Sequence, residues 1–198
     1  MAKPILFVDF DRTLFNTSAF TADLWLSLAT RYGIDAEQAK EEGKAYFNYV
    51  GNLYDYDFFS HMRRLTGESD AAIAYAVTQD LAGRQFLFDD SDEVFAWQQA
   101  GYDVRILTFG NEPYQRLKFA LAPGIVEKLP VVIICERKAD YLASAHAEQL
   151  GWLVDDKPDQ RLPIGFTEIN LDRTAQLPVS NGSGYVIVNS LTHVRNIL

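Results

Sequence analysis

Residues 5–14 of this 198-residue chain read ILFVDFDRTL. The first four are apolar without interruption, as in a strand that is buried on both faces, and two aspartates follow with one residue between them. Because side chains two residues apart in a strand point to the same side, we expect Asp9 and Asp11 to lie together just beyond the strand. Ligands of open α/β sheets bind at that carboxyl edge. The stretch therefore predicts a buried strand that presents two carboxylates at a ligand site.

Similar short apolar runs recur along the chain, at residues 104–108, 131–135, 152–154, 167–171 and 185–188. Helical patterns separate several of them, over residues 93–100, 113–121 and 139–150. Strands that are apolar on both faces need a layer on each side, and parallel strands need crossover connections, which these helices provide. The sequence therefore predicts an α/β fold with a doubly wound, Rossmann-like parallel sheet.

Residues 15–88 contain no such apolar strand run. Their patterns favour helices over residues 20–32, 35–49 and 70–82. Because a crossover connection normally adds only a few residues to its helix, this segment is too long to be one. We predict a helical cap inserted at residues 15–88, with an α/β core domain formed by residues 1–14 and 89–198.

The composition indicates a globular chain whose surface is acidic. Hydrophobic residues make up 48%, and 18 lysines and arginines against 27 aspartates and glutamates give a net charge of −9. Such a field repels nucleic acid and anionic lipid, so we expect neither as a partner. With no apolar run that would serve as a signal peptide or a membrane span, we expect a cytoplasmic protein. The single cysteine, Cys135, lies in an apolar run and is predicted to pack within a strand.

A second acidic pair, Asp155-Asp156, follows the apolar run at residues 152–154. If the strands are parallel, this pair lies at the same sheet edge as Asp9 and Asp11. Each pair taken alone is also compatible with a helix cap or a turn. Three or four carboxylates that converge on one site, however, are typical of a site for a hard cation such as Mg²⁺.

Two further residues end strands at that edge. Thr108 ends the run at residues 104–108, and the loop Phe109-Gly110-Asn111 then leads to a helix, so its hydroxyl is placed to donate to a phosphoryl oxygen. Lys138 follows the run at residues 131–135 by three residues. Each also has an ordinary interpretation, a strand-end threonine and a solvated surface lysine.

Together these four elements resemble the motifs of the haloacid dehalogenase-like (HAD) hydrolases. The first motif, Asp-x-Asp-x-Thr and an apolar residue, is matched by residues 9–14, and the second, a strand ending in Ser or Thr, by Ile106-Leu107-Thr108. Lys138 matches the third motif, and Val154-Asp155-Asp156 the fourth. The family places a helical cap, of the type called C1, where this chain has its insertion. Arg12 departs from the pattern, since many members have glycine there.

The resemblance implies a role for each matched residue. Asp9 is the nucleophile that forms an aspartyl phosphate, and Asp11 is the general acid and base. Mg²⁺ is held by Asp9, the Asp11 backbone carbonyl and Asp156, with Asp155 as an alternative ligand. Thr108 and Lys138 hold phosphoryl oxygens. The dehalogenase branch lacks the second aspartate, so Asp11 favours phosphoryl transfer.

The function predicted from the sequence is therefore a Mg²⁺-dependent phosphatase acting on a small phosphorylated metabolite. A phosphomutase on the same scaffold and a non-catalytic protein that binds a phosphorylated ligand remain alternatives. The substrate and the oligomeric state stay open.

Two assignments also stay open. Lys118 is a rival for the third-motif lysine, although its place inside the helix at residues 112–121 carries it away from the sheet edge. The insertion also holds an aromatic cluster, which either packs a small helical core or stacks on a nucleobase or sugar. Its members are Tyr46, Phe47, Tyr49, Tyr54, Tyr56, Phe58 and Phe59.

Overall fold

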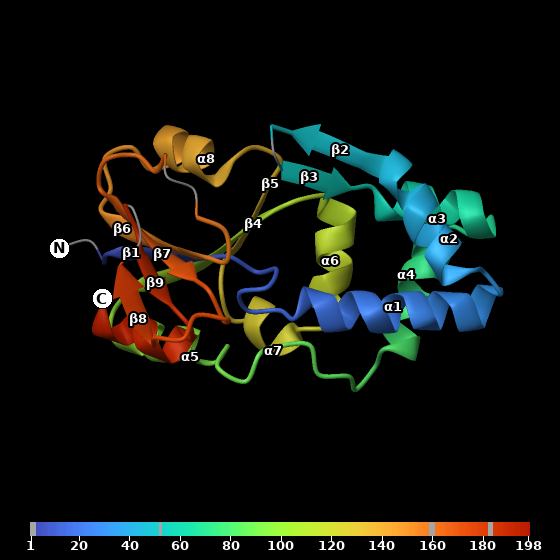
Figure 1. Ribbon diagram of the computed structural model, residues 1–198, viewed down its shortest axis with the longest axis horizontal. Helices are drawn as coiled ribbons and strands as arrows, with labels where there is room; N and C mark the ends of the chain where they lie inside the picture. Colours follow the sequence, from blue (N-terminus) through green and yellow to red (C-terminus); the bar gives the residue numbers. More distant parts are fainter. Residues whose placement is uncertain (1–2, 52, 159–160, 182–183) are drawn as a thin grey trace.

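The computed structural model describes residues 3–51, 53–158, 161–181 and 184–198, and its centre is a seven-stranded sheet (Figure 1). The strand order is β5-β4-β1-β6-β7-β9-β8, and every neighbouring pair is parallel except β8 with β9. The strands are β1 (Ile5–Val8), β4 (Asp103–Phe109), β5 (Val131–Ile134), β6 (Gly151–Asp155), β7 (Phe166–Leu171), β8 (Val179–Asn181) and β9 (Val186–Val188). The predicted doubly wound α/β fold is confirmed.

Both faces of the sheet are covered, which explains the uninterrupted apolar strands. Along β1, Leu6 and Val8 belong to one buried cluster, while Ile5 and Phe7 belong to another on the opposite face. The first face packs against α5 (Glu93–Gln99), α6 (Glu112–Ala120), α7 (Pro123–Val126) and η2 (Leu191–Asn196), and the second against α8 (Lys138–Ala145). None of the helices in the described part of the chain has the length and apolar character needed to cross a lipid bilayer.

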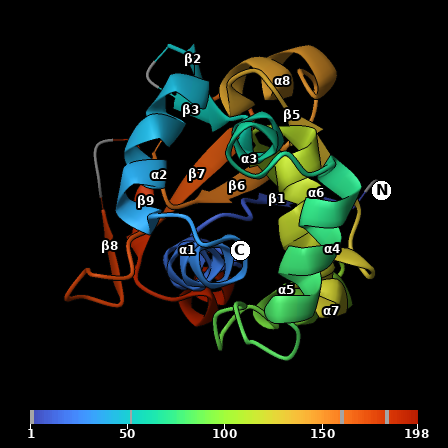
Figure 2. The same ribbon diagram turned by 90° about the vertical axis from the view of Figure 1, so that its right-hand side faces the viewer.

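The insertion forms a separate lobe beside the carboxyl edge of the sheet (Figure 1). It contains α1 (Thr17–Tyr32), α2 (Ala36–Gly43), η1 (Lys44–Tyr46), β2 (Phe47–Val50), β3 (Leu53–Tyr56), α3 (Phe58–Thr66) and α4 (Asp70–Asp80). Seen from the cap end in Figure 2, α6 of the core domain lies beside α3 and α4, so this helix forms the floor on which the cap packs.

The prediction of a purely helical cap is wrong at residues 47–56. These residues form the antiparallel hairpin β2–β3, and the helix expected to reach Tyr49 ends at Gly43. The hairpin strands are only partly buried, so they lack the continuous apolar run by which the core strands are recognised. The sequence pair Gly51-Asn52 is a hairpin signal, and Gly51 has the positive φ of 62° that such turns require.

Cys135 is a second correction. It lies one residue beyond β5, which ends at Ile134, and its side chain is exposed instead of packed. Because β5 is the edge strand of the sheet, its last residues have less structure around them than those of β1 or β4.

The chain leaves and re-enters the core domain through two linkers that lie side by side. Phe15 and Leu87 form an antiparallel bridge, and the Phe88 amide donates to the Leu14 carbonyl oxygen at 3.0 Å. Arg173 fixes this junction from the core domain, because its Nη2 donates to the Thr13 carbonyl oxygen at 2.8 Å and to Asp90 Oδ1 at 2.9 Å. Both linkers of the cap therefore run through one junction, which Arg173 braces from the core domain.

Candidate active site

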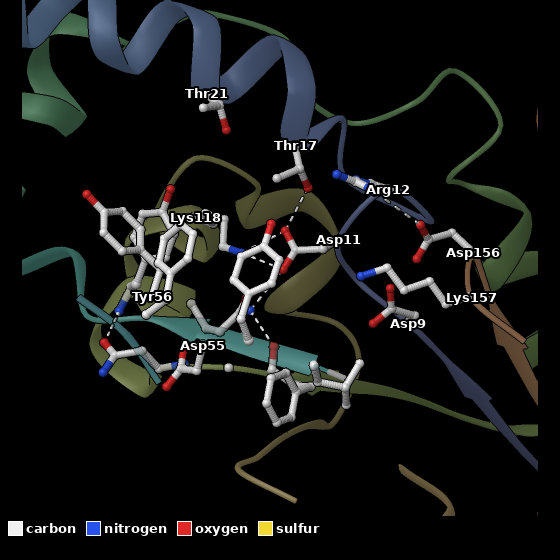
Figure 3. Close-up of a pocket in the computed structure, with 18 of the residues that line it drawn as sticks. Asp9, Asp11, Arg12, Thr17, Thr21, Asp55, Tyr56, Lys118, Asp156 and Lys157 are labelled. Carbon is white, nitrogen blue, oxygen red and sulfur yellow. Dashed lines mark hydrogen bonds and ion pairs between the residues drawn. The ribbon is translucent and has the colours of Figure 1, made fainter. Parts of the chain in front are cut away.

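A cavity of about 400 Å³ lies between the cap and the carboxyl edge of the sheet (Figure 3). Its floor holds the predicted carboxylates, and its upper walls are largely aromatic. The residues that line it with a charged side chain are five carboxylates and five cations, namely Asp9, Asp11, Asp55, Asp155, Asp156, Arg12, Lys40, Lys118, Lys138 and Lys157. The sequence-predicted carboxylates and Lys138 are therefore brought together in one cavity.

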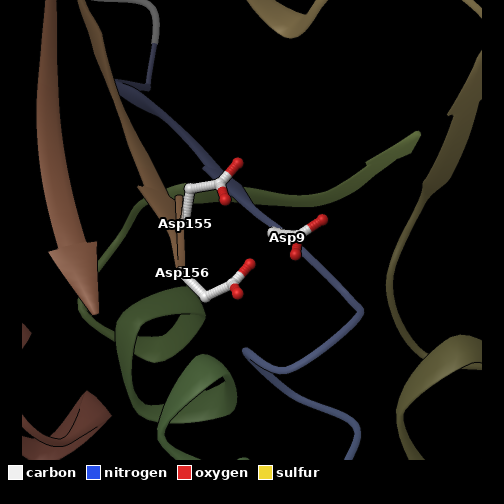
Figure 4. Close-up of side chains that lie close together, drawn as sticks. All are labelled: Asp9, Asp155 and Asp156. Atoms are coloured by element: carbon white, nitrogen blue, oxygen red, sulfur yellow. The ribbon is translucent and has the colours of Figure 1, made fainter. Parts of the chain in front are cut away.

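Asp9, Asp155 and Asp156 form an acidic cluster in which ligand oxygens of all three residues lie within 4.8 Å of one another (Figure 4). The parallel register of β1 and β6 pairs Val8 with Val154, so the two strands deliver their next residues to the same point. The Asp9 amide also donates to the Val154 carbonyl oxygen at 2.8 Å, which continues the pairing past the strand end. Three oxygen donors at this spacing form a candidate site for a divalent cation.

Lys138 balances part of this charge. Its Nζ lies 2.5 Å from Asp9 Oδ1 and 2.5 Å from Asp155 Oδ2. Burial lowers the pKa of the Lys138 ammonium, but Asp155 and Asp9 outweigh burial and raise it, so the lysine is charged. Burial raises the pKa of Asp9 to about 8 against the effect of Lys138, and Asp155 adds to the rise. One ammonium therefore does not neutralise the cluster, and a further positive charge would relax it.

Asp11 lies in the same cavity but in a different set of contacts. Lys118 Nζ donates to both of its carboxylate oxygens, at 2.6 Å for Oδ1, while Thr17 Oγ1 donates to Oδ1 at 2.7 Å and Gln115 Nε2 to Oδ2 at 2.9 Å. Burial alone would raise the pKa of Asp11, but the Lys118 charge and these hydrogen bonds outweigh it and lower the pKa. The carboxylate is thus held in its charged form.

The argument that Lys118 points away from the sheet edge is wrong. The flexible four-carbon stem of the side chain carries Nζ back to Asp11 from the last turn of α6, and the residue is buried. Lys118 and Lys138 contact different aspartates, and of the two it is Lys138 that contacts Asp9. Gln115 and Thr17 were not identified from the sequence, because hydrogen bonds between distant residues leave no periodic pattern.

Thr108 is fully buried near the end of β4, and its Oγ1 finds no hydrogen-bond partner among the described residues. It is not among the side chains that line the cavity, whereas Phe109, Gly110 and Asn111 of the following loop are. The hydroxyl is thus an unused donor beneath that loop. Its predicted contact with a phosphoryl oxygen stays a prediction.

Arg12 has the only positive φ, 61°, among the non-glycine residues that the structure describes. The left-handed conformation allows the chain to turn sharply after Asp11, and it costs an L-residue ~1–2 kcal/mol. The Arg12 guanidinium lies 4.0 Å from Asp156 Oδ2 (Figure 3). The Arg12 side chain is about half exposed. Lys157, which the sequence analysis did not single out, also lines the cavity beside Asp156.

The cap contributes one carboxylate of its own, Asp55 on β3. Asp55 Oδ1 accepts a hydrogen bond from the backbone N–H of Asn111, at the start of α6. Burial raises the pKa of Asp55, and the Asn111 and Tyr56 amides counteract part of this rise. Neither Asp55 nor this contact was predicted, since the whole hairpin was missed.

The members of the aromatic cluster lie in several environments, and Tyr46 stacks on His61 with ring centroids 4.7 Å apart. Phe58 and Phe59 are buried in the cap, as the packing interpretation expects. Phe47, Tyr54 and Tyr56 line the cavity, and Tyr49 is exposed outside it.

Comparisons with known proteins identify the fold. No family model matches the sequence, and no curated protein is similar to it. Solved structures are similar over nearly the whole chain. A haloacid dehalogenase-like hydrolase from Burkholderia xenovorans has a TM-score of 0.70 at 19% identity and covers 99% of this chain and 97% of its own.

Two other similar structures have lower TM-scores. The HAD-hydrolase YfnB from Bacillus subtilis, bound to magnesium, has a TM-score of 0.61 at 16% identity, over 100% of this chain and 99% of its own. The L-2-haloacid dehalogenase from Xanthobacter autotrophicus has a TM-score of 0.57 at 13% identity, over 99% of this chain and 98% of its own. With the strand order and the inserted cap described above, these similarities show that the chain has the haloacid dehalogenase-like fold.

Proposed function

We propose that this protein is a Mg²⁺-dependent phosphatase that hydrolyses a small phosphorylated metabolite through an aspartyl phosphate on Asp9. The observation that carries the proposal is the cluster of Asp9, Asp155 and Asp156, whose carboxylates meet at the base of the cavity, where Lys138 contacts Asp9 and Asp155. A scaffold gains nothing from three converging carboxylates, because their mutual repulsion destabilises it. A cation site beside a nucleophile explains them.

The residues present fit Mg²⁺. Asp9 and Asp156 offer carboxylate oxygens, the hard ligands that this ion prefers. Asp155 already has both oxygens engaged, Oδ1 by the Lys157 amide and Oδ2 by Lys138. The Asp11 backbone carbonyl is a further candidate ligand, as the family resemblance implies. When bound, the ion would polarise a phosphoryl oxygen and neutralise charge that develops during transfer.

The charge of the cavity supports a phosphate monoester as the ligand. Its five carboxylates and five cations cancel when all are ionised. A bound divalent cation would leave a charge of about +2, which matches the dianion of a monoester at neutral pH. A second phosphate group on the same ligand would leave an excess of negative charge in the cavity.

In the proposed reaction, an Asp9 carboxylate oxygen attacks phosphorus while the bond from phosphorus to the leaving oxygen breaks. Lys138, already beside Asp9, would hold the equatorial oxygens through its ammonium, and Thr108 would add a hydroxyl donor. The leaving oxygen takes a proton from Asp11. A water molecule then attacks the aspartyl phosphate and gives a proton back to Asp11, so that phosphate is released and Asp9 is regenerated.

The contacts of Asp11 suit the second step of this cycle, in which water attacks the aspartyl phosphate. Lys118, Gln115 and Thr17 hold it as a carboxylate, which is the form that accepts the proton of the attacking water. To protonate the leaving oxygen, Asp11 must first gain a proton and exchange the Lys118 contact for one to substrate.

Dehalogenation is the second candidate, because a haloacid dehalogenase is among the similar structures. It needs the same nucleophilic carboxylate but no metal site. The acidic cluster and Asp11 therefore favour phosphoryl transfer.

The test is phosphate release from a panel of phosphorylated metabolites with Mg²⁺ and with EDTA. We expect release only with Mg²⁺, and its loss in Asp9→Asn, which keeps the shape of the side chain but removes the nucleophile. Asp89→Asn, at an exposed carboxylate outside the cavity, is the matched control. Halide release from 2-haloacids without phosphate release would support the dehalogenase, and an isomerised sugar phosphate without free phosphate would support a phosphomutase.

A further inference from the structure

The cavity continues above the acidic cluster into the cap, and there its walls change character. Rings and aliphatic groups from both domains replace the carboxylates: Trp25, Phe47, Leu53, Tyr54 and Tyr56 from the cap, and Phe109 and Tyr114 from the core domain. With the phosphoryl group at Asp9, the part of the substrate that leaves as an alcohol would extend towards these walls.

Two of these rings keep part of their surface exposed after packing within the cap. Phe47 and Tyr54 stack on each other with centroids 4.7 Å apart and an interplanar angle of 20°, but Tyr54 still exposes 50% of its surface. Phe58 and Phe59, a few residues further along, are buried by contrast. Small helical modules pack large side chains inward, so partly exposed rings on the cavity wall need another explanation.

The polar groups of this upper region are mostly engaged already. Asp55 accepts from the Asn111 amide, and Tyr56 Oη lies 2.6 Å from His61 Nδ1. Lys40 Nζ pairs with Glu37 at 2.5 Å. What remains for a ligand is therefore mainly apolar and aromatic surface, with the negative charge of Asp55 nearby.

We propose that the leaving group of the substrate carries a planar, uncharged aromatic ring, which stacks on the Phe47–Tyr54 pair while the phosphoryl group lies at Asp9. This inference rests on the proposed phosphatase function and names its substrate class. Stacked rings gain more than their buried area provides, because the electron-rich face of one ring lies over the electron-poor edge of the other. An anionic group on the ring would be repelled by Asp55.

The size of the cavity agrees with such a ligand. About 400 Å³ lies within the range of ~300–1,000 Å³ that is usual for small-molecule sites, and it is more than a phosphate ion alone requires. Phosphorylated nucleosides and simple aryl-alkyl phosphates share the chemistry proposed here, and separate substrates distinguish them.

The test compares substrates that differ chiefly in whether the ring is aromatic and planar. Benzyl phosphate and cyclohexylmethyl phosphate are both esters of primary alcohols with a six-membered ring, so their leaving groups are similar in size and acidity. We expect kcat/KM to be about 3- to 10-fold higher for benzyl phosphate. A nucleoside 5′-monophosphate measured against ribose 5-phosphate shows whether the ring is a nucleobase.

Variants of the hairpin residues test whether the preference for benzyl phosphate arises from the hairpin. Phe47→Leu and Tyr54→Leu should reduce the benzyl-to-cyclohexylmethyl ratio towards one, mainly through KM. Tyr75→Leu is the control, because Tyr75 is an exposed tyrosine in α4 that does not line the cavity, so the ratio should stay unchanged. Thermal melts of each variant check that the fold is kept, and calorimetry of Asp9→Asn with the two esters measures the preference as binding, without turnover.

The outcomes separate the two proposals. Equal kcat/KM for the two esters, or a ratio that survives both leucine variants, would overturn the aromatic substrate class and leave the phosphatase function standing. No Mg²⁺-dependent, Asp9-dependent release from any ester would overturn the function, and the substrate class would fall with it.

Discussion

Asp55 in the cap accepts a hydrogen bond from the backbone N–H of Asn111 in the core domain. Asn111 is the N-cap of α6, so the carboxylate lies at the positive end of a helix. The contact joins the hairpin to the loop that follows β4, directly above the candidate site. A movement of the hairpin away from this loop would break the contact.

Asp55→Asn should loosen the cap. The amide keeps the size of the side chain but loses the charge, which is worth ~0.3–1 kcal/mol at a helix N-terminus. We expect faster amide hydrogen exchange in residues 47–56 and 110–112, with exchange in β1 unchanged. Asp70→Asn, at an exposed carboxylate in α4, is the control. Unchanged exchange in the hairpin would show that the Asp55 contact does not hold the cap closed.

Mg²⁺ should stabilise the protein through the acidic cluster. At a concentration ~100 times its Kd, a ligand that binds only the native state adds ~2.7 kcal/mol, which corresponds to an increase in Tm of about 5–10 °C. Asp156→Ala should abolish this shift. Lys138→Met should lower Tm without metal, because Asp9 and Asp155 lose their common cation, and yet retain the shift. Thermal melts with Mg²⁺ and with EDTA measure both, and an equal shift in Asp156→Ala would disprove the metal site.

His61 should make the cap sensitive to mild acid. Burial lowers the pKa of this histidine, and its Nδ1 is hydrogen-bonded to Tyr56 Oη at 2.6 Å. A folded-state pKa below the unfolded value of ~6.5 means that the unfolded chain binds more protons, so stability is complete above that pH and falls as the pH drops towards the folded pKa.

The measurement compares the parent protein with His61→Gln between pH 7.5 and 5.5. We expect the parent to lose about 1 kcal/mol more unfolding free energy over this range than the variant. The other histidines, His146 and His193, are common to both proteins, so their titration cancels in the difference. If the unfolding free energy of the two proteins changed equally with pH, the acid sensitivity would not come from His61.

Arg173→Met should weaken the junction between cap and core domain. The substitution removes the contacts to Asp90 and to the Thr13 carbonyl oxygen, and the stacking of the guanidinium 3.8 Å from the Phe88 ring centroid. We expect a loss of ~2 kcal/mol, since hydrogen bonds to charged groups contribute ~1.5–3 kcal/mol. Arg195→Met, at an exposed residue 4.0 Å from Glu93, should cost little. Denaturant unfolding measures the loss of unfolding free energy in both variants, and equal losses would contradict the role of Arg173.

The sheet and its acidic cluster are predictable because they depend on short-range patterns. The uninterrupted apolar runs before Asp9 and Asp155 require strands covered on both faces, and parallel pairing then brings the following residues together without further information. The residues around Asp11 are different. Lys118, Gln115 and Thr17 reach it from two helices, and their meeting depends on how the cap and α6 pack, which no local pattern records.

The hairpin was missed for a related reason. Its strands are half-buried, and aromatic residues fit both an amphipathic helix and an exposed strand. Only the pair Gly51-Asn52 pointed to a turn, and two residues are easily outweighed by the helical pattern on either side.

The adjacent linkers at Phe15 and Leu87 make the insertion a replaceable module. Because the two ends of the insertion meet, a lobe of another length could join the core domain at the same place, provided that it packs on α6 and supplies the Thr17 hydroxyl that donates to Asp11. Such an exchange would change the upper walls of the cavity and leave Asp9, Asp155 and Asp156 in place.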